Sequence, residues 1–483
     1  MKITHIASEC APFAKSGGLG DVVYGLSRRL TQLKHPCQMI IPDYPSVENR
    51  VEKQLYDRFP VTFNGDTFDV IVSKATFHDL TIFLIDSTHS QNLFKRKDIY
   101  GEADDTHRFL CFSYFALSFL DRHLEIAGDI LHLHDWVTGF CSCFLKWKFP
   151  ALRSHIKGTL LCIHNLQHQG ITKKDHLSYF KIPLDEIPAA YLQDSDPSYL
   201  NIAKAAIIEA STCVTVSPSY LKEIQTPAFG FGLHTLIQQH HAKFHAVLNG
   251  IDTDFWNPEK DLHLHRNWRP HALLEEIQEA KYRNKHFLQK KLNLTLSHEP
   301  LFIFISRLVD QKGPHLMVEA LKHIEKNGGQ AVLLGSEPQA HLKPLFEPLL
   351  KSSNLHINFT FQEHLSHLCF AAADFIVIPS IFEPCGLTQM ISMRYGTVPI
   401  VRKTGGLSDT VFDIDHSPKP IDERNGLVFE YPTLDSMDYI INRAFNLFKN
   451  EKETWNRVMK SCLSYDFSFK KAADQYLAIY RSI

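Results

Sequence analysis

The segment KSGGLGDV, residues 15–22, places a lysine, three glycines and an aspartate just after the first hydrophobic run of the chain. Glycine lets the backbone approach a ligand closely, and the N–H groups at a helix start attract anions. These residues could form a loop that binds a phosphate or a sugar. A tight turn entering a helix, with Asp21 matched to the helix dipole, fits them equally well. A dinucleotide fingerprint does not, because its third glycine would fall on Val23.

Two polar segments follow predicted strands farther along the chain. In HLHDW (132–136) and IHNLQHQG (163–170), Asp135, His164 and Asn165 come after the apolar run. Ligands of open α/β sheets bind beyond the carboxyl ends of the strands, so these side chains are candidates for a site.

Histidine pairs raise the alternative of a metal site. His132 and His134 alternate onto one face of their predicted strand. The chain has 28 histidines, so close pairs arise easily, and no cysteine or carboxylate set has ligand spacing. We therefore interpret them as core or hydrogen-bonded histidines and expect no metal.

The second half contains a pair of cations after a predicted strand. In SRLVDQKG (306–313), Arg307 and Lys312 combine a planar fork with a point charge, which suits a diphosphate. A solvated surface pair is the competing interpretation, and the position at the end of a buried strand argues against it.

Two further segments repeat the plan of strand, loop and helix. In SIFEPCGLTQM (380–390), Glu383 precedes a turn, and the amides around Gly386 could bind a phosphate. A glutamate that merely caps the helix is the alternative. RKTGGLSDTV (402–411) places a glycine pair in the same context.

Buried strands must position these segments. Short β-branched runs alternate with helical patterns in both halves, which is typical of βαβ units and mainly parallel sheets. The predicted strands lie at 2–8, 38–44, 81–86, 129–136, 158–165, 213–218, 301–308, 330–336, 357–362, 374–380, 398–403 and 426–430. FNGDTF (63–68) carries an Asn-Gly hairpin signal. A polar, His-rich stretch at 259–298 separates the two series.

The last segment predicts an amphipathic closing helix. FSFKKAADQYLAIYRSI (467–483) puts Phe469, Ala473, Tyr476 and Tyr480 on one helical face, which needs a surface to cover.

Composition limits the class of protein. The 483 residues exceed one ordinary core, and 44% hydrophobic with 22% charged residues is a globular composition. A net charge of -2 provides no strong overall field for nucleic acid or anionic lipid. The 10 cysteines include no CxxC pair, so we expect reduced thiols. Without a signal-like start or a membrane-length apolar run, we expect a cytoplasmic protein with no membrane or nucleic-acid partner.

The ordered set of segments resembles the bacterial and plastid glycogen and starch synthases, which are retaining glucosyltransferases. The resemblance is carried by ECAPFAKSGGLGDVV, HDW, HNLQHQG, VSPSY, LNGID, SRLVDQKG, EPCGLTQ and RKTGGLSDTV across nearly the whole length. It implies an α/β fold of GT-B type, with two facing Rossmann-like, doubly wound domains and a deep interdomain cleft. The expected domains are 1–250 (acceptor side and glycine loop), 251–465 (nucleotide-sugar side) and 466–483 (closing helix on the first domain).

The resemblance also implies a reaction. Glucose would pass from ADP-glucose, or alternatively from UDP-glucose, to the 4-hydroxyl at the non-reducing end of glycogen or a maltooligosaccharide. The anomeric configuration would be retained, with no metal and no cofactor.

Roles for individual residues follow from the same resemblance. The expected catalytic set is Glu383, His164, Lys312, Arg307 and Asp135. Acceptor contacts fall on Glu9 and Asp135. The expected donor-binding set is Lys15, Gly17, Gly18, Asp21, Asn249, Arg307, Lys312, Glu383, Cys385, Gly386, Leu387 and Thr388.

Some positions depart from relatives. Many related transferases have a second glutamate eight positions after the first; this chain has Ile391 there, as in synthases of this type, so Glu383 would act without it. Ala205 and Ala206 replace the usual glycine pair, and residues 92–101 follow the tyrosine-containing loop only loosely. These last two departures bear on base and acceptor preference.

Three other functions fit parts of the pattern. A nicotinamide-dependent dehydrogenase is also doubly wound, and Asp43 could mimic a ribose-binding acid, but GxGxxG is missing. A glucan phosphorylase would need a lysine-bound pyridoxal phosphate, and no segment resembles that site. A glucan-binding protein without catalysis is opposed by the retained Lys15, His164 and Glu383.

Overall fold

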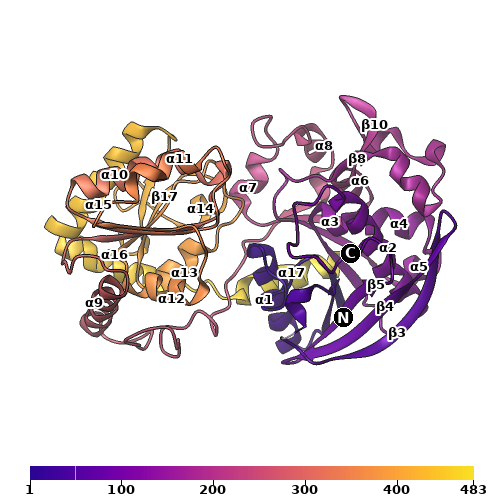
Figure 1. The fold of residues 1–483 in the computed structure, drawn as a ribbon, viewed down its shortest axis with the longest axis horizontal. Coiled ribbons are helices and arrows are strands. Elements are labelled where there is room, and N and C mark those ends of the chain that lie inside the picture. The colour runs from indigo at the N-terminus through magenta and orange to yellow at the C-terminus, as the bar shows by residue number, and fades with distance from the viewer. Residues whose placement is uncertain (49) are drawn as a thin grey trace. The chain divides into compact units, whose positions relative to one another are not determined.

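The computed structural model describes residues 1–48 and 50–483. Two compact units make up the chain (Figure 1). Unit 1 combines residues 1–250 with 469–483, and unit 2 spans residues 251–468. Each unit is an α/β body with its own central sheet.

Unit 1 is built on a nine-stranded sheet in the order β12-β11-β7-β6-β1-β2-β5-β4-β3. Its strands are parallel except at one edge, where β4 runs antiparallel to both neighbours. The bounds are β1 Ile3–Ile6, β2 Cys37–Pro42, β3 Lys53–Phe63, β4 Asp66–Phe77, β5 Leu80–Ser87, β6 Ile130–His134, β7 Gly158–Ile163, β11 Thr212–Thr215 and β12 Phe244–Ala246. A small second sheet has the order β8-β10-β9, with β8 Ile171–Lys173, β9 Leu192–Gln193 and β10 Asp196–Asn201.

The antiparallel edge confirms the predicted hairpin. Asn64 and Gly65 join β3 to β4 with φ of 49° and 90°, values that the Asn-Gly pair adopts at little cost.

Helices flank the sheet of unit 1. Because β1, β2, β6 and β7 are buried along their whole lengths, their apolar runs require cover on both faces. The helices are α1 Gly18–Gln32, α2 Asp105–Arg122, α3 Asp135–Gly139, α4 Cys141–Trp147, α5 Pro150–His155, α6 Ile202–Glu209, α7 Pro218–Glu223, α8 His234–Gln239 and α17 Phe469–Ser482.

The closing helix α17 packs against α1 (Figure 1). A Cβ at Gly25 of α1 would lie 2.1 Å from the ring of Phe469, so this glycine permits the close approach. The predicted apolar face is confirmed, since Phe469, Ala473, Tyr476 and Tyr480 are all buried. The C-terminal segment thus completes the core of unit 1.

Unit 2 contains a six-stranded parallel sheet in the order β15-β14-β13-β16-β17-β18. The strands are β13 Leu301–Ser306, β14 Gln330–Gly335, β15 Leu355–Asn358, β16 Phe375–Ile378, β17 Val398–Arg402 and β18 Leu427–Phe429. The helices are α9 Leu274–Lys291, α10 Pro314–Lys326, α11 Lys343–Phe346, α12 Glu363–Ala372, α13 Thr388–Arg394, α14 Gly405–Thr410, α15 Leu434–Asn450 and α16 Lys452–Ser464.

Two segments of unit 2 differ from expectation. The strand predicted at 357–362 ends at Asn358, whose side chain accepts the N–H of Thr360 and turns the chain. The polar stretch at 259–298 contains the helix α9, which packs against α12. Its buried positions are spaced for a helix, but lysines and an asparagine among them hide the pattern.

All ten cysteines are buried and free, as the absence of paired spacing predicted. Burial raises the pKa of the Cys37 and Cys213 thiols to about 12. Among the described residues, no helix is both long and apolar enough to cross a membrane.

Candidate active site

The glycine loop of unit 1 is held by a buried carboxylate. Gly17 caps α1 with an extended backbone, φ -153° and ψ -164°. Glu9 Oε2 accepts the N–H of Ser16 at 2.6 Å and of Gly17 at 2.9 Å. The Tyr100 hydroxyl donates to Glu9 Oε1 at 2.8 Å. Glu9 therefore shapes the loop, a role that its sequence context did not reveal.

The charged ends of the same loop are paired. Lys15 Nζ lies 2.8 Å from Asp21 Oδ1, and both side chains remain partly exposed. An exposed pair of this kind contributes little to stability. Breaking this pair therefore costs little free energy, and Lys15 can bind a ligand anion in place of Asp21.

Asp135 and His164 meet because β6 and β7 are parallel neighbours. Asp135 begins α3 with φ 56°, a conformation that aspartate tolerates better than most residues. Its Oδ1 accepts the N–H of His164 at 2.7 Å and of Asn165 at 3.3 Å. Burial raises the pKa of Asp135 to about 7 in spite of these bonds.

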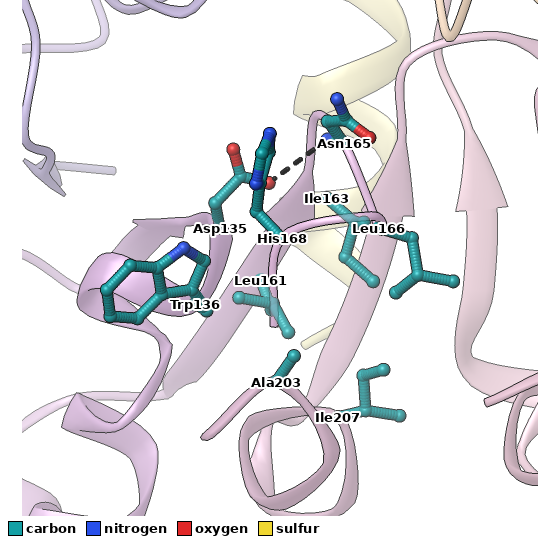
Figure 2. A pocket seen from close by; sticks show the side chains of 9 residues that line it. All are labelled: Asp135, Trp136, Leu161, Ile163, Asn165, Leu166, His168, Ala203 and Ile207. Carbon is teal, nitrogen blue, oxygen red and sulfur yellow. Dashed lines mark hydrogen bonds between the residues drawn. The ribbon is translucent and has the colours of Figure 1, made fainter. Parts of the chain in front are cut away.

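Beside these residues lies a small cavity. Figure 2 shows Asp135, Trp136, Asn165 and His168 at its polar side, with the bond from Asn165 to Asp135 drawn. Leu161, Ile163 and Ile207 form the apolar wall, which comes from the interior of the sheet and α6. The carboxyl edge of the sheet thus carries the polar groups, as predicted.

A larger cavity of about 380 Å³ adjoins Trp136. It is lined by Trp136, Gln167, His168, Gln169, Gly170, Ile171, Gln193 and Phe231. Two aromatic rings combined with amide side chains suit a sugar, which offers an apolar ring face and many hydroxyls. Gly170 makes the shape possible, because a Cβ there would lie 2.2 Å from the Trp136 ring. The sequence did not predict Gln193 and Phe231 as site residues, since neither follows a predicted strand of the main sheet.

The histidines of β6 are core residues. His134 Nδ1 lies 3.0 Å from His164 Nε2, and His134 Nε2 lies 3.1 Å from His5 Nδ1. His132 Nδ1 instead lies 2.6 Å from the Tyr480 hydroxyl. His5, His132 and His134 lie close enough to suggest a metal site. Their rings stack, however, and both nitrogens of His134 are already hydrogen-bonded, so the hydrogen-bonded interpretation is the better one.

Asn249 is the last expected donor-binding residue of unit 1. Its side chain is buried, and Oδ1 has no hydrogen-bond partner within the part of the chain described here. Buried polar atoms in proteins are almost always paired. An unpaired amide oxygen is therefore consistent with a ligand hydroxyl as its partner.

In unit 2 an ion pair joins the two predicted phosphate segments. Lys312 Nζ lies 2.5 Å from Glu383 Oε2, and the Ser380 hydroxyl donates to the same oxygen at 2.8 Å. Lys312 ends a short 3-10 helix, Asp310–Lys312, and Gly313 follows with φ 67°. A Cβ at Gly313 would lie 2.3 Å from the Pro379 carbonyl oxygen, so glycine lets the two loops touch.

The turn after Glu383 is packed against the glycine pair at 405–406. Gly406 donates its N–H to the Glu383 carbonyl at 3.0 Å, and a Cβ there would lie 2.1 Å from the Cys385 oxygen. Gly386 adopts φ 74°, and Gln389 donates to the carbonyls of Cys385 and Gly386. The predicted donor residues 385–388 are thus held beside Glu383.

Arg307 is exposed after β13, and its side chain has no ion pair among the described residues. The structure gathers most of the other expected residues into three groups. Two lie in unit 1: the glycine loop with Glu9, Lys15, Gly17, Gly18 and Asp21, and the pair of Asp135 and His164. Lys312, Glu383 and 385–388 lie together in unit 2.

Comparison with known proteins identifies the chain's relatives. The family described as starch synthase catalytic domain matches residues 2–239, and that described as glycosyl transferases group 1 matches residues 286–453. The glycogen synthase of Protochlamydia amoebophila is 38% identical, with 100% of this chain and 99% of the relative covered. The chain belongs to the glycogen and starch synthase family. It is a glucosyltransferase of GT-B class, as the sequence predicted.

Other relatives agree with this assignment. The probable glycogen synthase 2 of Nostoc sp. is 38% identical, over 100% of this chain and 99% of the relative. The catalytic domain of starch synthase IV from Arabidopsis thaliana, solved bound to ADP and acarbose, superposes with a TM-score of 0.94 at 38% identity. That likeness covers 99% of this chain and 98% of the plant chain.

Three positions noted in the sequence now have a place in the fold. Ala205 and Ala206 are fully buried in α6, and Ile391 is buried in α13. The loosely matching loop at 92–101 contributes Tyr100, which binds Glu9.

Proposed function

We propose that this glucosyltransferase moves glucose from ADP-glucose to the 4-hydroxyl at the non-reducing end of an α-1,4-glucan, with retention and without a metal ion. The ADP bound to the plant relative supports an adenine nucleotide donor. UDP-glucose, which differs only at the base, is the second candidate. Glycogen or a maltooligosaccharide is the acceptor. Initial rates with the two nucleotide sugars distinguish the donors.

The observation that carries the proposal is the Lys312–Glu383 pair. Cleavage of the bond between glucose C1 and the diphosphate leaves negative charge on the leaving group and cationic character at the sugar. Lys312 and Arg307 stabilise the negative charge on the leaving diphosphate, and Glu383 faces the cationic sugar. Their contact at 2.5 Å holds the lysine in place before the donor binds.

Residues of unit 1 serve the sugar and the acceptor. Lys15, Gly17, Gly18 and Asp21 bind the diphosphate side of the donor, while His164 and Asn249 contact the transferred glucose. Asp135, which lines the small cavity beside Trp136, and Glu9 act on the acceptor side. The division of roles follows the expected domains, with 1–250 on the acceptor side, 251–465 on the nucleotide-sugar side and 466–483 as the closing helix.

Retention is explained by attack on the same face. With Ile391 where related transferases have a second glutamate, this region offers no second carboxylate for a covalent intermediate. The departing phosphate then accepts the proton of the acceptor hydroxyl, and Glu383 and His164 position and stabilise the sugar.

Substitution of the pair tests the proposal. Glu383→Gln and Lys312→Met should each lower kcat by about 100-fold or more, since a preorganised charge contributes about 3 kcal/mol. Lys285 and Asp374 form a matched buried pair in the same unit, with Nζ 2.8 Å from Oδ2. Lys285→Met should lower the melting temperature and leave kcat within about twofold. Near-normal turnover of either site variant would refute the assigned roles.

One incubation tests the alternative that this protein binds glucan without catalysing a reaction. Glycogen and labelled ADP-glucose, mixed with the purified protein, should yield labelled glucan and free ADP. Binding of glycogen without release of ADP would favour the non-catalytic alternative.

A further inference from the structure

Three histidines of unit 1 form one continuous hydrogen-bond chain. It runs from His5 in β1 through His134 in β6 to His164 after β7, with nitrogen–nitrogen distances of 3.1 and 3.0 Å. His5 and His134 are fully buried. The chain therefore links the interior of the sheet to the residue proposed to contact the transferred glucose.

Counting protons along the chain leaves two arrangements. A neutral imidazole has one N–H donor and one acceptor nitrogen, so each ring that accepts on one side must donate on the other. Burial lowers the pKa of His5 and His164 to about 3 and that of His134 well below its usual value, so all three are neutral. The protons consequently lie either on all three Nδ1 atoms or on all three Nε2 atoms.

The inner end of the chain decides between these arrangements. His5 Nε2 is buried and has no hydrogen-bond partner among the residues that the structure describes. A buried N–H without an acceptor is rarer in proteins than an acceptor without a donor. The unpaired Nε2 is therefore the acceptor, and His5 carries its proton on Nδ1. His134 then donates through Nδ1 to His164 Nε2.

We propose that His134 is a positioning residue that fixes the proton of His164 on Nδ1, so that His164 can only donate at its remaining ring nitrogen. A sugar hydroxyl oxygen is the matching acceptor. This inference rests on the proposed placement of His164 at the transferred glucose. The second nitrogen of a histidine commonly sets the state of the first in this way.

His132 provides a matched control on the same strand. Its ring stacks on His134, with centroids 4.3 Å apart, and it is equally buried. Its hydrogen bond goes to Tyr480 in α17 and not into the chain. Loss of this ring therefore disturbs the same core without interrupting the path to His164.

Nitrogen NMR of the free enzyme tests the proton position. Long-range 1H–15N spectra of [15N]histidine-labelled protein should show His164 protonated at Nδ1, with the signal assigned by its absence in His164→Gln. The Nδ1–H form should be lost in His134→Phe. His134→Asn should retain it, because the Asn amide places an N–H near the former Nδ1. His132→Phe should also retain it. An Nε2–H form of His164 in the wild type overturns the proposal, and so does an unchanged form in His134→Phe.

Steady-state kinetics test the consequence for the reaction. His134→Phe should lower kcat about tenfold and leave the donor KM within about twofold, and His134→Asn should recover most of kcat. Equal losses in His132→Phe and His134→Phe would reduce the effect to core packing and overturn the proposal. If the NMR results hold but kcat never changes, the proposed role of His164 at the sugar is wrong. If His134→Phe does not fold, the wild-type spectrum and His134→Asn still decide the proton position.

Discussion

Replacing Gly17 by alanine adds one methyl group to a loop that does not need glycine for its own shape. The backbone is extended at φ -153°, which any residue adopts, and a Cβ there would meet nothing within 4 Å. The N–H that donates to Glu9 is kept. We therefore expect the free energy of unfolding to change by less than about 1 kcal/mol, since alanine restricts the unfolded chain but is a poorer N-cap than glycine.

Activity should respond quite differently if a phosphate approaches this backbone. A methyl group in its path displaces at least one charge-assisted hydrogen bond, worth about 1.5–3 kcal/mol. That loss corresponds to a fall in kcat/KM for the donor of roughly 10- to 150-fold.

The assay combines initial rates across donor concentrations with urea unfolding of the same samples. Gly20→Ala is the contrasting variant, because a Cβ there lies 3.3 Å from the Ala11 nitrogen and the Ala14 oxygen. It should lose about 1 kcal/mol of stability and little kcat/KM. A folded Gly17→Ala enzyme with wild-type kcat/KM would refute the phosphate interpretation of the loop.

Further predictions concern pH, packing and ions. The pKa of Asp135 is about 7 in the folded protein and about 4 in the unfolded chain. Between these two pH values the unfolded state loses its proton first, so the wild type becomes less stable as the pH rises. Asp135→Asn does not titrate. Thermal unfolding should therefore show it about 2 kcal/mol more stable than the wild type at pH 8, after discounting for partial exposure, and equal at pH 3.5. Gly25→Ala should lose about 1–3 kcal/mol in urea unfolding because its methyl group meets Phe469, and an unchanged midpoint would contradict the packing of α17 on α1. Glucan elongation should keep its rate with a chelator present, whereas loss with EDTA and recovery with magnesium would contradict a metal-free reaction.

The sequence predicted those parts of the fold that depend on local pattern. Continuous apolar runs gave nearly all the core strands, and Asn64–Gly65 gave the hairpin, because both signals are local. Helix α9 was missed because Lys281 and Lys285 are buried in it. Lys281 is accommodated by donating to the Tyr395 carbonyl and the Thr397 hydroxyl, partners that come from elsewhere in the sequence.

The site was predictable where a residue follows a strand. Asp135 and His164 meet because their strands pair, and Lys312 and Glu383 meet because Gly313 permits the contact. Partners supplied by distant loops could not be found, since no spacing links Tyr100 to Glu9.

Both units contain buried cysteines, so the reactivity of these thiols reports how often each unit opens locally. Cys369, Cys385 and Cys462 belong to unit 2, and the other seven cysteines belong to unit 1. A buried thiol reacts only when its surroundings unfold, because the reagent cannot otherwise reach it. Alkylation of the unmodified enzyme, followed peptide by peptide, would therefore measure how often each half opens. If the donor binds residues 385–388 as proposed, its presence should slow labelling of Cys385 more than that of Cys462.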